Sequence, residues 1–324
     1  MDPHILFAYS LSGPERGHPI ATDAEIAAAL GAEAPAWLHL SASDPASDAW
    51  IDRHMAYLDA PVRDALTEPL TRPRAVRIGG GLLVNLRGIN FNEGDDPGDM
   101  VSVRMWIDPH RIVSLSRRPL RSVRAVADRV ASGQGPERSG DLLAQLVEEL
   151  TDRIETQVAD LEDRAERLEA LVVADPRPEL GSELSGLRLE LIELRRFLSP
   201  QRDAVQAILR AGLDWIDGGD RQLIAEQHDQ LSRVIETLDA LRDQFQTMRD
   251  ELEAARADRT NRNLYILSVI SAVFLPLGFL TGLMGINLGG MPGAGWPFGF
   301  WVFSGLLAGV GILVLLLMRR LHLF

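Results

Sequence analysis

A long stretch without any charged side chain constrains this chain more than any other feature. From Leu264 to Met318 there is no Asp, Glu, Lys, Arg or His, although 24% of the 324 residues are charged. A segment rich in Gly and Pro, 285–297, divides the stretch into two apolar segments, Leu264–Met284 and Phe298–Met318. As helices rising about 1.5 Å per residue, both are long enough to cross a hydrocarbon core of about 30 Å. The sequence therefore predicts two membrane-spanning helices.

Arginines orient this hairpin. They stand before the first segment, at Arg256, Arg259 and Arg262, and after the second, at Arg319 and Arg320, whereas the loop is uncharged. Because positive residues stay on the cytoplasmic side, we expect both termini inside and the loop outside. The first residues lack a basic region followed by an apolar core, so we expect no signal peptide. The expected location is a bacterial inner (plasma) membrane.

The expected organisation has six parts. They are a cytoplasmic α/β domain (1–140), a helical stalk region (141–263), the first span (264–284), the outer loop (285–297), the second span (298–318) and a cytoplasmic tail (319–324). The fold class is therefore α+β, with long stalk helices and a transmembrane hairpin.

Composition excludes several function classes. A net charge of −13 disfavours nucleic acid as a partner and suits cations. The absence of cysteine excludes disulfides and thiolate metal sites. The sequence shows no nucleotide-binding loop, catalytic triad or clustered metal ligands, so we expect neither an enzyme nor a resident cofactor.

Apolar patterning predicts the elements of the first domain. We expect strands at His4–Leu11, Trp37–Leu40, Arg74–Ile78, Leu82–Asn90, Val101–Ile107 and Arg111–Ser116. We expect helices at Thr22–Leu30, Asp48–Glu68 and Leu120–Val130. Further helices follow at Asp141–Ala174 and up to Leu198, where Ser199-Pro200 predicts a boundary or a kink before the helix resumes to about Ala211.

A heptad pattern marks the next helix. Apolar residues alternate at spacings of three and four, namely Leu231, Val234, Leu238, Leu241, Phe245, Met248, Leu252 and Ala255. No Gly or Pro stands between Asp220 and Leu275, and Pro276 is tolerable inside a span, so one helix can run from about Asp220 to Met284. The pattern predicts packing against other helices, from the same chain or from identical neighbours.

Two spans cannot enclose a water-filled path, so a conducting protein must assemble around an axis. The first span is the better lining segment, because it carries small and polar residues at Ser268, Ser271, Gly278, Thr281 and Gly282. The second span carries Gly305, Gly309 and Gly311, a pattern suited to close helix packing.

Gly285-Ile286-Asn287 ends the first span. A ring of Asn287 carboxamides can accept hydrogen bonds from the water shell of a hydrated cation. Gly285 allows the helix end to close and backbone carbonyls to turn inward. A plain helix C-terminus also accounts for the same three residues.

The chain resembles the CorA metal ion transporter superfamily and, within it, the zinc transporter (ZntB) branch. The resemblance rests on Phe274-Leu275-Pro276-Leu277, on the segment from Thr281 to Pro292 that contains Gly285-Ile286-Asn287, on Thr71-Arg72-Pro73-Arg74 and on Leu82–Asn90. It implies a funnel-shaped homopentamer in the lipid bilayer, whose first spans line the pore. It also implies first contact of the hydrated cation with Asn287, and apolar constrictions at Leu264, Leu267 and Leu275.

Two departures from the magnesium-type members favour the zinc branch. Those members carry Met where this chain has Ile286, and they often carry an acidic residue in the outer loop, which here has none. We expect Zn²⁺ uptake, with weak discrimination against Co²⁺, Ni²⁺, Cd²⁺ and Mg²⁺, because no Cys or His lies in the spans. Proton coupling would need pore water or cytoplasmic groups, since no titratable side chain lies in the spans.

Three alternatives stay open. Stalk carboxylates such as Asp250 and Asp258 either bind cytoplasmic cations or form a solvated face. A Mg²⁺ or Co²⁺ channel fits the same architecture. A membrane-anchored coiled-coil scaffold would account for the helices, but it would not account for the polar Asn287 at the end of the first span.

Overall fold

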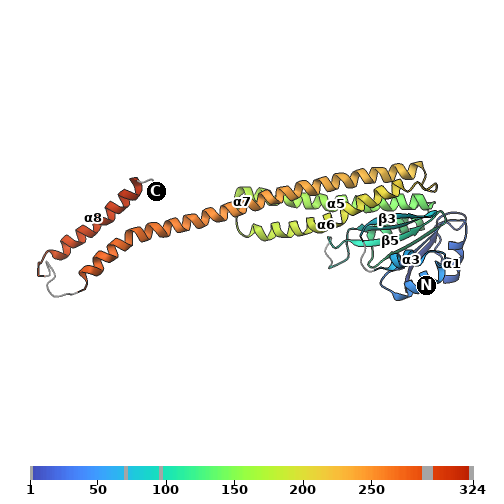
Figure 1. Cartoon of the computed structure of the whole chain (residues 1–324), viewed down its shortest axis with the longest axis horizontal. Helices are drawn as coiled ribbons and strands as arrows, with labels where there is room; N and C mark the ends of the chain where they lie inside the picture. The colour runs from blue at the N-terminus through green and yellow to red at the C-terminus, as the bar shows by residue number, and fades with distance from the viewer. Residues whose placement is uncertain (1–2, 69–71, 95–97, 287–294, 321–324) are drawn as a thin grey trace. The chain divides into compact units, whose positions relative to one another are not determined.

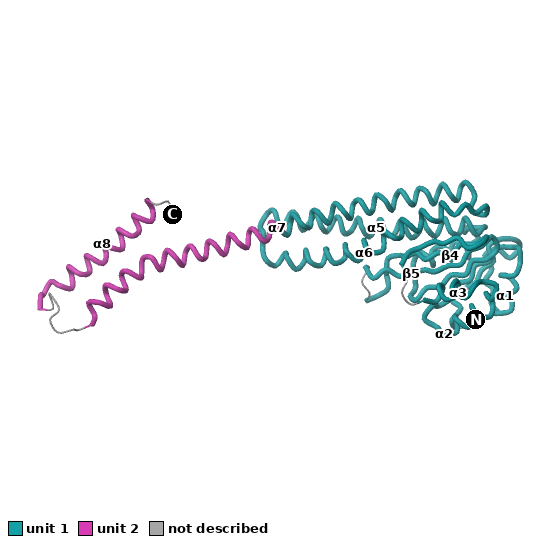
Figure 2. The backbone as a smooth tube through the Cα atoms, viewed as in Figure 1, with its two compact units in different colours: residues 1–249 teal, residues 250–324 magenta. Residues whose placement is uncertain are grey.

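The computed structural model describes residues 3–68, 72–94, 98–286 and 295–320. The chain divides into two compact units, residues 1–249 and 250–324, which Figure 2 draws in different colours. Asn287 and most of the predicted outer loop fall in 287–294, outside the described residues.

A six-stranded sheet forms the centre of the first unit (Figure 1). Its strands are β1 (Ile5–Ser10), β2 (Ala36–Ser41), β3 (Arg74–Ile78), β4 (Gly81–Gly88), β5 (Val101–Ile107) and β6 (Arg111–Ser116), in the order β1-β2-β6-β5-β4-β3. Neighbours are antiparallel except β2 and β6, which run parallel and bring Ser41 opposite Ser116 at their carboxyl ends. All six predicted strands are confirmed, and so is the α+β class.

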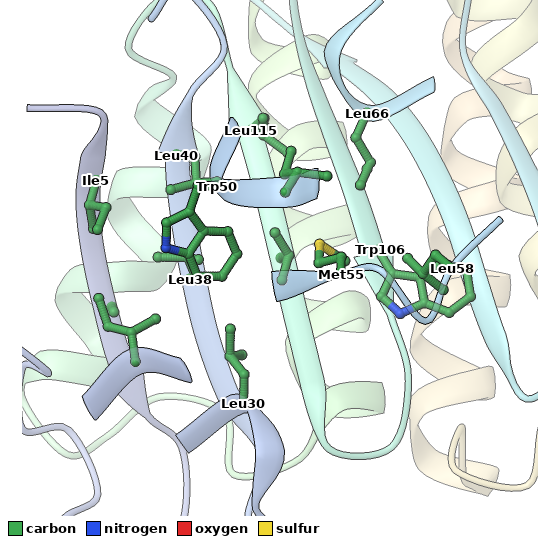
Figure 3. Packing of buried hydrophobic residues seen from close by; sticks show 14 of the residues in the cluster. Ile5, Leu30, Leu38, Leu40, Trp50, Met55, Leu58, Leu66, Trp106 and Leu115 are labelled. Carbon is green, nitrogen blue, oxygen red and sulfur yellow. The ribbon is translucent and has the colours of Figure 1, made fainter. Parts of the chain in front are cut away.

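Three short helices cover one face of the sheet. They are α1 (Asp23–Gly31), α2 (Pro45–His54) and α3 (Ala60–Thr67). Figure 3 shows Trp50 and Met55 lying over Leu38, Leu40 and Leu115 of the strands, all of them buried. Removing such side chains from water contributes about 1.5–3 kcal/mol each, which holds this layer on the sheet.

The prediction of one helix at Asp48–Glu68 is wrong, because the structure has two. α2 ends at His54, and α3 begins at Ala60 with a proline in its first turn. Pro61 is tolerated there because the first-turn N–H has no partner within the helix, whereas in the middle of a helix its ring would clash with the preceding turn. The break also lets Met55 and Leu58 turn into the core.

The other face of the sheet carries α5 (Ser139–Ala174) and α6 (Leu180–Arg210) (Figure 1), and α4 (Arg121–Ala131) packs against α5. Gly88 in β4 lets α5 approach closely, since a Cβ there would stand 2.7 Å from Leu150 Cδ2. Gln201 of α6 is 1% exposed and binds the backbone of β4 twice, accepting from the N–H of Arg87 at 2.7 Å and donating to its carbonyl at 2.9 Å.

The sequence predicted a boundary or a kink at Pro200; α6 continues through it, so the boundary is wrong and the kink stays a prediction. Proline removes one hydrogen bond from the helix. The buried face on both sides of it, which includes Leu194, Leu198, Ala204 and Val205, supplies packing that offsets this loss.

The long helix predicted from about Asp220 is confirmed as α7 (Gly218–Met284). Within the first unit its seam residues are buried, namely Leu231, Val234, Leu238, Leu241, Phe245 and Met248. Polar contacts flank the seam: Gln244 donates to Glu169 of α5 at 2.8 Å, and Arg195 of α6 pairs with Asp239. Helices of the same chain therefore fill this part of the seam.

Candidate functional site

The second unit consists of the distal part of α7 and of α8 (Gly299–Arg320). Both helices are long and apolar enough to cross a membrane. Their large side chains are exposed, for example Leu275 at 74% and Trp301 at 72%. Exposure of so much apolar surface to water is unfavourable, so lipid or other protein must cover it.

α8 packs on one side of α7 only. The partly buried residues of the distal α7 recur every three or four positions and form one face, which comprises Val269, Val273, Pro276, Leu277 and Leu280. The matching face of α8 comprises Phe303, Leu307, Val310, Gly311, Val314 and Met318. A Cβ on Gly311 would lie 3.8 Å from Leu277 Cδ1, an ordinary van der Waals distance between the two helices.

Of the three glycines in the second span, only Gly311 lies near α7 of the same chain. Gly305 and Gly309 are exposed, and a Cβ added to either would meet nothing within 4 Å among the described residues. Phe303 and Leu307 are partly buried and lie on the same face of α8 as Gly311. The glycine pattern of the second span therefore does not form the packing face within one chain.

The residues predicted to line a pore lie together on the opposite side of α7. They are Leu264, Leu267, Ser271, Leu275, Gly278 and Gly282, and every one of them is exposed. At about 100° per residue this row points away from Val273 and Leu280, which face α8. The chain thus leaves this row uncovered, while it covers the reverse side of the same helix.

Two hydroxyls in the span are satisfied by their own helix. Ser268 donates to the carbonyl of Leu264 at 2.8 Å, and Thr281 donates to the carbonyls of Leu277 at 2.9 Å and Gly278 at 3.0 Å. Such bonds let hydroxyls stand in an apolar environment without an outside partner.

The end of α7 closes at Gly285. Its N–H donates to the carbonyls of Thr281 at 3.0 Å and Gly282 at 3.1 Å. A Cβ on Gly285 would stand 3.3 Å from the Thr281 carbonyl oxygen, a tight contact that favours glycine. Gly285 is not one of the described glycines with positive φ, so the helix closes without a left-handed residue. Ile286 is 53% exposed and is the last described residue before Asn287.

The stalk carboxylates do not assemble a metal site within one chain. Asp250 and Asp258 are both exposed, and eight residues of helix separate them by about 12 Å along the axis. Across the described ranges there is no group of three or more His, Cys, Asp or Glu side chains that could hold a metal ion. A cation site at these positions would therefore need neighbouring copies.

His39 in β2 is held in the core. Its Nδ1 lies 2.8 Å from Ser114 Oγ, and its Nε2 lies 3.1 Å from Ser116 Oγ. Burial lowers the pKa of His39 to about 3, and a hydrogen bond to Ser114 opposes that shift only in part. The ring is therefore neutral, and its hydrogen bonds join β2 to β6. This agrees with a structural role rather than a metal-binding one.

A family model described as CorA-like Mg²⁺ transporter protein matches residues 32–320. This chain belongs to that family. As a member of this family, the chain is a metal ion transporter. Both apolar helices of the second unit lie within the matched residues.

Individual relatives support the assignment to the CorA family. The divalent cation transporter CmaX of Pseudomonas aeruginosa is 36% identical over 320 residues, which are 98% of this chain and 96% of the relative. The zinc transport protein ZntB of Pectobacterium atrosepticum is 38% identical over 296 residues, 91% and 89% of the two chains. The solved structure of full-length CmaX superposes with a TM-score of 0.81 at 34% identity and covers 99% of both chains.

One group of arginines in this CorA-family chain was not predicted from the sequence as a site. Four arginines line a cavity of the first unit: Arg117 and Arg118 lie between β6 and α4, and Arg121 and Arg124 lie in the first turns of α4. The run Arg-Arg-Pro-Leu-Arg directly after a strand is the signal that marks them. The cavity that these arginines line lies at the carboxyl ends of β2 and β6. The sequence does not reveal that these two strands pair in parallel.

Proposed function

We propose that the chain carries divalent cations, with Zn²⁺ as the physiological ion, across the bacterial inner membrane as a homopentamer. One observation carries the proposal: the row from Leu264 to Gly282 is exposed on the side of α7 that α8 leaves uncovered. Five copies arranged with α8 outward would turn these rows toward a common axis. Membership of the CorA-like family supports a metal ion as the cargo.

The residues of the row would have different roles in such a pore. Leu264, Leu267 and Leu275 would form apolar constrictions, whereas Ser271, Gly278 and Gly282 would leave room for a hydrated ion. Gly285, Ile286 and Asn287 would form the outer mouth, with the Asn287 carboxamide accepting hydrogen bonds from the ion's water shell. Because that shell is retained, we infer weak binding and modest selectivity.

The driving force needs no titratable group in the spans. A membrane potential of about 100 mV favours entry of a divalent cation by about 4.6 kcal/mol when the inside is negative. We propose both termini in the cytoplasm, on the basis of the arginines that flank the spans. Asp250 and Asp258 would then bind cytoplasmic cations between copies.

Ion flux into proteoliposomes tests the proposal. Vesicles loaded with a zinc-sensitive dye are compared for the native chain, for Asn287→Ala, and for the control Leu316→Ala, which trims an exposed side chain of α8. We expect zinc entry with the native chain and the control, and at least a tenfold slower entry with Asn287→Ala, about the effect of losing one good hydrogen-bonding group. A series of pH gradients then reports whether protons are coupled to the ion.

A magnesium transporter is the second candidate, and the description of the matching family model favours it. Magnesium flux without zinc flux in the same vesicles would select that candidate. Vesicles that pass no divalent ion would leave a membrane-anchored scaffold and would end the transport proposal.

A further inference from the structure

A cavity of about 570 Å³ opens in the first unit at the carboxyl ends of β2 and β6. Ser41 and Ser116, the last residues of these strands, line it together with the first turn of α4. β2 and β6 are the parallel pair of the sheet, and β6 leads directly into α4. Open α/β sheets bind ligands in this position, outside the carboxyl ends of parallel strands. The volume suits a small organic molecule.

Four guanidinium groups surround this cavity in a chain whose net charge is −13. Arg118 lies 3.6 Å from Asp99 and Arg124 lies 3.0 Å from Asp128, and all four of these side chains are at least 48% exposed. Arg117 makes no ion pair within the described part of the chain. Exposed pairs of this kind contribute little, so much of the positive potential is left for a ligand.

A helix N-terminus also contributes to the positive potential at the cavity. The start of α4 adds to this potential, because its N-cap residue, Leu120, offers no side chain to the free N–H groups of the first turn.

Apolar and aromatic side chains form the rest of the wall. The ring of Phe7 is fixed by the stacked ring of His39 at 5.0 Å and by the edge-on ring of Trp37 at 4.8 Å. Phe91 lies beneath the guanidinium of Arg121, 4.8 Å from its ring centre. Both phenylalanines line the cavity. The wall therefore offers rigid ring faces beside a group of phosphate-binding donors.

We propose that this cavity binds a nucleoside di- or triphosphate. The arginines and the N-terminus of α4 would hold the phosphates, and the base would lie against Phe7 and Phe91. The site belongs to the first unit, so nucleotide binding does not depend on the transport function proposed above.

Calorimetric titration of the full chain in detergent micelles tests this site. ATP, pyrophosphate and adenosine are titrated separately into protein in buffer with EDTA, so that no divalent cation bridges ligand and protein. The test variant is Arg117→Gln/Arg124→Gln. The matched control is Arg53→Gln/Arg167→Gln, which removes two exposed arginines of the same unit away from the cavity. Arg117→Lys keeps the charge at one position, and melting temperatures report whether each variant is folded.

We expect saturable ATP binding, weakened at least about tenfold in the test variant and by less than about twofold in the control. Arg117→Lys should retain most of the affinity, and adenosine alone should bind too weakly to measure. Equal affinity of the folded test variant and the native chain, or no saturation up to about 1 mM ATP, would overturn the site. Pyrophosphate binding as tightly as ATP would overturn the nucleotide and leave an inorganic phosphate site.

Discussion

At the scale of the residue, burial fixes the charge of His39. Its side chain lies between two serine hydroxyls in the sheet and is 3% exposed. Because its pKa is lowered to about 3, the folded protein leaves the ring neutral in the pH range where the unfolded chain, with an ordinary pKa of about 6.5, binds a proton. The unfolded state therefore gains stability as the pH falls below about 6.5, and the folded state does not.

We expect the free energy of unfolding to fall by about 1.4 kcal/mol between pH 7.5 and 5.5 through this residue alone. His39→Gln cannot titrate and should lose this part of the pH dependence, although it will be less stable at both pH values. Urea unfolding of the full chain in micelles measures both quantities. His18→Gln, which changes an exposed ring, should keep the pH dependence of the native chain. Identical slopes for native chain and His39→Gln would show that His39 protonates in the folded state.

Arg138 and Asp220 join the start of α5 to the start of α7. Both Asp220 oxygens accept from Arg138, at 3.1 Å each, and the Asp220 side chain is 5% exposed. Hydrogen bonding to Asp220 is the main cause that raises the pKa of Arg138. Asp220 also accepts from the backbone N–H of Asp217 at 3.0 Å. Removal of the arginine would leave a buried carboxylate without its cation.

For Arg138→Ala we expect a loss of about 1–3 kcal/mol, reduced from the value for a fully buried pair because the arginine is half exposed. The melting temperature of the full chain should fall by several degrees. Arg242→Ala is the control, because it breaks a pair with Asp243 in which both side chains are more than half exposed. That variant should melt within about 1 °C of the native chain. A similar shift for both variants would contradict a special role of the Arg138 pair.

At the scale of the element, the heptad seam of α7 changes its surroundings along the helix. Leu238 is 0% exposed and packs within the first unit. Leu252 occupies the same kind of seam position in the second unit, yet it is only partly buried. Two leucines at equivalent seam positions therefore have different environments on one helix. Their difference in exposure indicates how far α5 and α6 cover the seam.

Leu238→Ala should cost about 2–5 kcal/mol, because it leaves a cavity in a packed core. Leu252→Ala should cost less than about 1.5 kcal/mol in a chain that meets no neighbour at this position. Urea unfolding of the two variants makes the comparison, and the matched substitution cancels differences in residue type. Equal costs would show that another copy of the chain covers Leu252 in solution.

Local patterns predicted elements well and their partners poorly. Alternating or continuous apolar residues predicted the strands, most of which bury one face or both, although β3 has no fully buried residue. The heptad spacing predicted a helix that buries a seam. The two-helix structure of 45–67 depends on the direction in which the chain turns at Met55, and the continuity of α6 through Pro200 depends on its packing against β4. The arginine cavity escapes prediction because it needs the parallel pairing of β2 and β6, which joins segments far apart in the sequence.

The candidate site shows the same division. The spacing of Leu264, Leu267, Ser271 and Leu275 is enough to predict that they share one face, because the geometry of a helix alone fixes that. Which face α8 would cover was not predictable. Within one chain only Gly311 comes near α7, so close packing of Gly305 and Gly309 stays a prediction. The role of Asn287 stays a prediction.

At the scale of the whole molecule, the absence of cysteine allows a direct test of the pore. A single introduced cysteine is then the one reactive thiol in each chain. If the row of α7 surrounds a water-filled path, Ser271→Cys meets water and a membrane-impermeant thiol reagent should modify it and slow ion flux. Val273→Cys lies two residues away on the same helix but on the face that packs against α8.

We expect modification of Ser271→Cys to be at least about tenfold faster than that of Val273→Cys, since a thiol reacts as the thiolate and needs contact with water. Leu316→Cys, on the exposed side of α8, should also react slowly because lipid would cover it in a pentamer with α8 outward. Rates are measured by mass spectrometry on proteoliposomes in which zinc flux is followed in parallel. Fast reaction at Leu316→Cys with slow reaction at Ser271→Cys would reverse the two faces and place α8 on the axis. Slow reaction at all three positions would mean that no water reaches the spans. That result would contradict the passage of hydrated cations along this row of α7.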